Sequence, residues 1–110
     1  IACGDETTVL TASAVAKVTF TMPYAMTLTE VMASVVVAPT TTTVVVDIHD
    51  GAATIMGTHK LDILTTAFVD DNTAVVSDTA LAKDAIITVY VDTADVAAAG
   101  LKIWLIGTRT

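Results

Sequence analysis

The chain has 110 residues, of which 54% are hydrophobic and 15% charged, with 5 basic and 12 acidic side chains and a net charge of -7. This length fits one domain, residues 1–110, and is too short for two. The acidic balance argues against nucleic-acid binding, because the phosphates would be repelled. No apolar run reaches the roughly 20 residues of a membrane-spanning helix, so we expect no membrane insertion. The apolar surplus instead indicates a subunit interface.

Threonine and valine dominate the sequence, and both are β-branched residues that favour extended backbone. We therefore expect an all-β fold, an antiparallel β-sandwich of about eight short strands. In chain order, the expected strands are residues 7–11, 17–22, 28–37, 43–49, 54–56, 60–64, 86–92 and 101–106.

Turn-forming residues separate these strands. Pro39 ends one strand, and the four threonines of 40–43 predict a turn before the next. Residues 78–84 are compatible with one helical turn, and the alanine cluster of 92–100 predicts a loop or a single turn.

Alternate side chains of a strand point to opposite faces of the sheet. In the strand around residues 44–48, this places Val44, Val46 and Ile48 on one face. Asp47 and His49 lie on the other face, which we expect to be partly exposed to solvent.

The last two expected strands are apolar on both faces. One face of each carries an aliphatic set, namely Ile87, Val89 and Val91 in the first and Leu101, Ile103 and Leu105 in the second. The opposite faces carry Ile86, Tyr90, Trp104 and Ile106, which we predict to form one exposed patch that serves as an interface. The alternative is that another layer of the same domain covers these residues.

Two groups of polar residues contain side chains that can bind metal ions. Asp47, His49 and Asp50 are close in sequence, and His59 lies on a neighbouring segment, but two ligands on one strand face do not make a site. Solvated polar residues beside a turn are the competing interpretation, and we favour it.

The cluster Asp70, Asp71 and Asn72 offers oxygen ligands for calcium, but its spacing does not match an EF-hand loop. An ordinary acidic turn is the simpler interpretation. We expect no metal site and no cofactor.

No motif for nucleophilic, glycosidic or phosphate chemistry is present, so we expect no catalytic residues and no enzyme activity. Cys3 follows Ile1 and Ala2 in a pattern similar to a bacterial lipoprotein signal. Those two residues would be removed by processing, which favours an unmodified thiol.

Several segments together resemble a phage domain. The most specific is the block Met-Pro-Tyr-Ala-Met-Thr-Leu-Thr-Glu-Val at 22–31. The others are residues 1–8, 17–20, 38–40, 46–48, 77–82, 99–102 and 105–109. Over nearly the whole chain, the sequence resembles the small β domain that often ends fibre-like virion proteins of bacteriophages and prophages.

This resemblance implies a jelly-roll-like sandwich, a homotrimer, and a place on the virion at the distal part of a tail or head fibre. It supplies no catalytic residues. The chain departs from the family pattern at Thr21 and Met32, where arginines are usual, and at Ile86 and Tyr90, where acidic residues are usual. These departures make the outer surface more apolar and favour a domain embedded in an assembly.

The leading hypothesis is therefore a self-associating virion structural protein. Its expected partners are copies of itself, other virion proteins, and a glycan or protein of the host cell surface. A capsid decoration or cement protein is the alternative within this class. Alternatives from other classes are a carbohydrate-binding module, suggested by the fold alone, and a bacterial surface lipoprotein, suggested by Cys3 alone.

Overall fold

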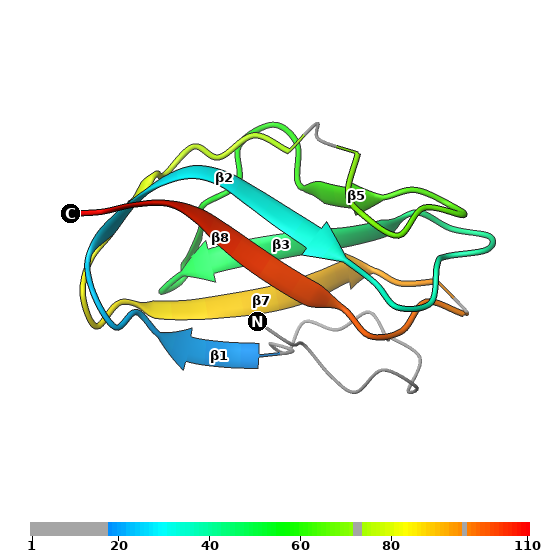
Figure 1. The fold of residues 1–110 in the computed structure, drawn as a ribbon, viewed down its shortest axis with the longest axis horizontal. Coiled ribbons are helices and arrows are strands. Elements are labelled where there is room, and N and C mark those ends of the chain that lie inside the picture. Colours follow the sequence, from blue (N-terminus) through cyan, green and yellow to red (C-terminus); the bar gives the residue numbers. More distant parts are fainter. Residues whose placement is uncertain (1–17, 72–73, 96) are drawn as a thin grey trace.

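The computed structural model describes residues 18–71, 74–95 and 97–110. These residues form eight β-strands, which pair antiparallel in two sheets that pack as a sandwich (Figure 1). The expected all-β sandwich is confirmed. Within the described ranges, no helix is long and apolar enough to cross a membrane.

The larger sheet has five strands. Its strands are β1 (Val18–Thr21), β7 (Ile86–Thr93), β3 (Val44–Asp50), β4 (Ala53–Thr54) and β5 (Leu61–Ile63). β7 lies between β1 and β3, and β3 also pairs with β4 and β5.

The smaller sheet has three strands, β6 (Ala80–Leu81), β2 (Met26–Ser34) and β8 (Lys102–Arg109), with β2 in the centre. Successive strands β1 and β2 pair with β7 and β6, respectively. This nested pairing between two sheets is the arrangement of a jelly roll.

The core lies between the two sheets and follows the expected alternation. Val44, Val46 and Ile48 of β3 are completely buried. The aliphatic sets of the last two long strands also face inward, with Ile87, Val89, Val91, Leu101 and Ile103 fully buried and Leu105 packed at the margin. Burying each such side chain contributes about 1.5–3 kcal/mol.

β8 extends to Arg109, three residues beyond the expected end at Ile106. A β-bulge between Leu28 and Glu30 of β2 shifts the register of the pairing with β8. Gly107 lies opposite Leu28, and a Cβ atom at residue 107 would collide with the carbonyl oxygen of Thr27. Glycine therefore permits this close approach. Because glycine is uncommon inside strands, the sequence Gly-Thr-Arg does not predict that β8 continues to Arg109.

Other boundaries also differ from the expectation. β2 ends at Ser34 rather than at residue 37, because the next amides bond to a loop: Val35 donates to the carbonyl of Phe68. The helical turn considered at 78–84 is wrong, since β6 forms there and pairs with the start of β2. The expected strand at 7–11 lies outside the described residues.

The threonine turn between β2 and β3 is held by one carboxylate, that of the buried residue Asp95. Its oxygens accept backbone N–H bonds from Thr40, Thr41 and Thr42 at 2.8–3.0 Å, and a further one from Ala97 at 2.9 Å. Burial acts to raise the pKa of Asp95, but these four donors outweigh it and hold the pKa well below its usual range.

We therefore predict that Asp95→Asn lowers the stability of the domain in a pH-dependent way. Because the folded-state pKa is depressed, the stabilising effect of the charge is present above the unfolded pKa of about 3.9 and is lost as pH falls through the folded value. Urea unfolding of both proteins across the acid range measures this. The gap between them should shrink below about pH 4, and a gap that is constant with pH would contradict the assignment.

Candidate functional site

The four residues predicted to form one interface patch do not lie together. Ile86 and Tyr90 project from the outer face of the five-stranded sheet, because Ile87, Val89 and Val91 face inward. Trp104 and Ile106 project from the outer face of the three-stranded sheet.

The expectation of a single patch is therefore wrong. β7 and β8 belong to different layers of the sandwich, so side chains that point away from the core on these strands point in opposite directions.

The two pairs also differ in their surroundings. Ile86 is 55% exposed, whereas Tyr90 is half-buried and its ring packs on that of His49, with 4.7 Å between the centroids. Tyr90 is thus covered in part by its own domain. On the other sheet, Trp104 is 44% exposed and lies opposite the half-buried Met32.

Met32, Trp104 and Ile106 form an apolar strip on the outer face of β2 and β8, and we call it the outer strip. Ile106 lies two residues along β8 from Trp104, on the same face, and pairs with Glu30. The backbone beneath the strip is fixed by the pairing of two long strands, so these side chains have a rigid base.

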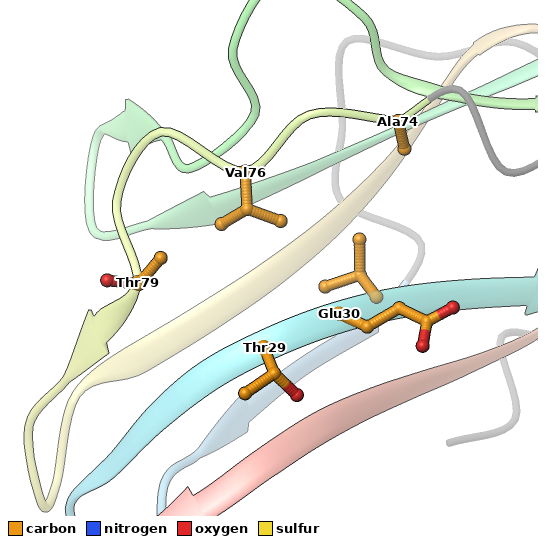
Figure 2. A pocket seen from close by; sticks show the side chains of 6 residues that line it. Thr29, Glu30, Ala74, Val76 and Thr79 are labelled. Atoms are coloured by element: carbon orange, nitrogen blue, oxygen red, sulfur yellow. The ribbon is translucent and has the colours of Figure 1, made fainter.

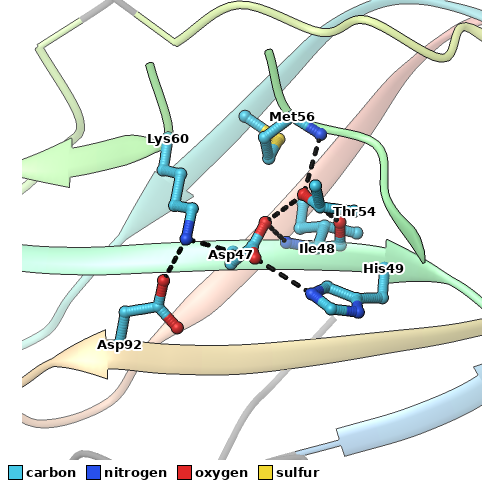
Figure 3. A network of polar contacts seen from close by, with 7 residues as sticks. All are labelled: Asp47, Ile48, His49, Thr54, Met56, Lys60 and Asp92. Atoms are coloured by element: carbon cyan, nitrogen blue, oxygen red, sulfur yellow. Dashed lines mark hydrogen bonds and ion pairs between the residues drawn. The ribbon is translucent and has the colours of Figure 1, made fainter. Parts of the chain in front are cut away.

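On the outer face of the five-stranded sheet, Asp47 is the centre of a polar network (Figure 3). The side chain is buried, and its carboxylate is 3.0 Å from His49 Nε2 and 3.4 Å from Lys60 Nζ. The hydroxyl of Thr54 and the backbone N–H of Ile48 also donate to it. Lys60 reaches on to Asp92.

This network ties the segment that carries Thr54 and Lys60 onto the sheet. Burial acts to raise the pKa of Asp47, but the hydrogen bonds from Thr54 and His49 and the charge of Lys60 outweigh it and lower the pKa. Asp47 is therefore an ionised, fully partnered group, and neither Asp50 nor His59 takes part in its contacts.

Metal binding gains no support from the structure. In residues 18–71, 74–95 and 97–110, no group of three or more His, Cys, Asp or Glu side chains is placed to hold an ion. Asp70 is buried, and its Oδ1 accepts the backbone N–H of Ala33 at 3.0 Å. Asn72 and Cys3 lie outside the described residues.

The sandwich has a small pocket at the edge of β2 (Figure 2). It has a volume of about 160 Å³ and is lined by Thr29, Glu30, Val31, Ala74, Val76 and Thr79. Glu30 is the one ionisable side chain among these lining residues.

A larger groove of about 310 Å³ opens between the edge strands β1 and β8. Its lining is apolar and aromatic, and consists of Phe20, Met22, Pro23, Tyr24, Met26, Ile103, Trp104 and Leu105. The guanidinium of Arg109 lies over the ring of Tyr24, 4.7 Å from its centroid. The groove is therefore suited to an apolar guest beside a cationic group.

One exposed apolar residue, Phe68, could not be predicted from the sequence. Phe68, in the loop after β5, is 57% exposed, and its neighbours Val69 and Leu64 are also exposed. The loop lacks the alternation of a strand, so no periodic signal marks it.

We predict that Asp47→Ala lowers the free energy of unfolding by about 3 kcal/mol, because four donors lose their shared acceptor in a buried position. Asp92→Ala is the matched control, since it removes only the exposed contact of Lys60 and should cost about 1 kcal/mol or less. Denaturant titration measures both. Equal costs would show that Asp47 does not anchor the segment.

Comparisons with known proteins add no relative: no family model, no curated protein and no solved structure matches this chain.

Proposed function

We propose that this chain is a structural domain of a bacteriophage virion that works by self-association and by contact with neighbouring virion proteins. The observation that carries the proposal is the outer strip, Met32, Trp104 and Ile106, on a rigid sheet. Exposed tryptophan in an apolar surrounding is typical of interface centres.

The amount of exposed apolar surface supports association. Besides the outer strip, large apolar side chains are exposed at Val36, Val37, Leu64, Phe68, Val69, Val75 and Ile86. Monomeric proteins rarely present large contiguous apolar patches, because water contact with them is unfavourable and promotes aggregation. A partner that covers the outer strip would remove part of this cost.

The roles of the buried carboxylates also support a function that depends on the surface. The carboxylates of Asp47, Asp70 and Asp95 are used by backbone amides or by neighbouring side chains within the fold. In the described part of the chain, these buried acids therefore have structural roles. The surface, rather than a polar centre, is the feature left for function.

The phage assignment and the trimer come from the sequence resemblance. Of the four residues at which this chain departs from the pattern, Thr21 is exposed and Tyr90 is half-buried. The other two are Ile86, which is exposed on one sheet, and Met32, which lies half-buried in the outer strip of the other. Both replace charged residues by apolar ones, which favours a domain surrounded by other subunits. A capsid decoration protein would use the same surface chemistry at another place on the particle.

The outer strip gives a direct test of self-association. We expect Trp104→Asp to convert the assembled protein into monomers, because a carboxylate buried in an apolar contact is strongly unfavourable. Val75→Asp is the matched control, since Val75 is equally exposed, at 45%, on the segment that precedes β6. Light scattering coupled to gel filtration gives the masses. Loss of assembly in the control alone would contradict the role of the strip.

The place on the virion can be tested with purified phage particles. We expect peptides of this chain to co-purify with intact particles, and labelled antibodies to mark fibres. Labelling distributed over the head would favour the decoration protein instead. Expression during infection with no copies in the particles would reject a structural role.

A further inference from the structure

The sandwich has two different lateral flanks. On one flank, the edge strands β1 and β8 border the apolar groove. On the opposite flank lie β5, β6 and the loop between them (Figure 1). β2 and β3 stand between the flanks, so a side chain on one flank cannot enter the groove of its own copy on the other.

The second flank carries a protruding apolar group. Leu64, Phe68 and Val69 are all exposed, and we call them the knob. The knob rests on a fixed backbone, because the carbonyl of Phe68 accepts the N–H of Val35 at 2.9 Å and Val69 forms a β-bridge with Ser34. It is therefore a preformed surface feature.

The charges around the two features are opposite. Asp62 lies in β5 just before the knob, and Asp71 follows the knob and donates its backbone N–H to the carbonyl of Asp62. Burial and the charge of Asp71 act to raise the pKa of Asp62, and His59 acts to lower it, with a net rise. The groove instead has Arg109 beside Tyr24.

We propose that the knob of one copy occupies the groove of the next copy, with Phe68 as its central residue and the acidic pair near Arg109. The groove, at about 310 Å³, has room for the phenyl ring and a neighbouring aliphatic side chain. This inference rests on the proposed function and specifies the contact through which self-association occurs.

A knob and a groove on different flanks make a heterologous contact, in which the two partners use different surfaces. Repetition of such a contact closes a ring or extends a filament, depending on the rotation from copy to copy. A trimer with three-fold symmetry requires a contact of this kind, because a two-fold contact closes at two copies.

The test uses two variants of the full chain, each with one defective surface. Phe68→Asp removes the knob and leaves the groove, whereas Tyr24→Asp places a carboxylate in the groove and leaves the knob. Both side chains are partly exposed, so circular dichroism and the unfolding midpoint should match wild type. Val75→Asp again serves as the surface control.

We expect each variant alone to be monomeric in light scattering and native mass spectrometry, while wild type and the control assemble. An equimolar mixture should form dimers that contain one copy of each variant, because one intact knob meets one intact groove. Two results would overturn the inference: Phe68→Asp assembling like wild type, or a mixture that stays monomeric.

The masses of wild type and Phe68→Asp together distinguish a wrong contact from a wrong proposed function. If wild type assembles and Phe68→Asp assembles equally well, the knob contact is wrong and self-association stands. A groove filled by another segment or partner would also give this result. If wild type is itself monomeric, the proposed self-association fails as well.

Discussion

The burial of aliphatic side chains between the two sheets is the constraint on which the rest of the molecule depends. Val46, Ile48, Val89 and Ile103 meet in a core with no exposure to solvent. Because alternate residues of the same strands must then face outward, the apolar residues at those positions have no place inside the domain. Trp104 is exposed for this reason, and it is the apolar surface on which the proposed self-association rests.

The polar residues complete the same fold. Asp95 holds the turn between β2 and β3, Asp47 holds the segment that contains Thr54 and Lys60, and Asp70 accepts the amide of Ala33. The carboxylates of Asp47 and Asp95 each exchange water for several donors of the protein, which is how a buried charge becomes compatible with folding. Asp47 and Asp70, which resemble metal ligands in the sequence, thus hold neighbouring segments of the fold in place.

The fold class and the inward faces could be predicted from the sequence, because alternation in 44–48 and 87–91 is a local property of a strand. The position of Trp104 relative to Ile86 could not, since periodicity separates the two faces of one strand but does not assign strands to layers. β6 could not be predicted either, because a strand of two residues is too short to show an alternation of apolar and polar side chains. The groove and the knob around Phe68 arise from loops and edges that meet only in the folded chain.

The central claim is that this domain functions through what it packs against, and the mass of the wild-type protein in solution tests it most directly. Sedimentation velocity from micromolar to submillimolar concentration would give that mass without a surface or a label. We expect a discrete assembly larger than one chain, which forms reversibly as concentration rises. A single monomeric species over the whole range would contradict it.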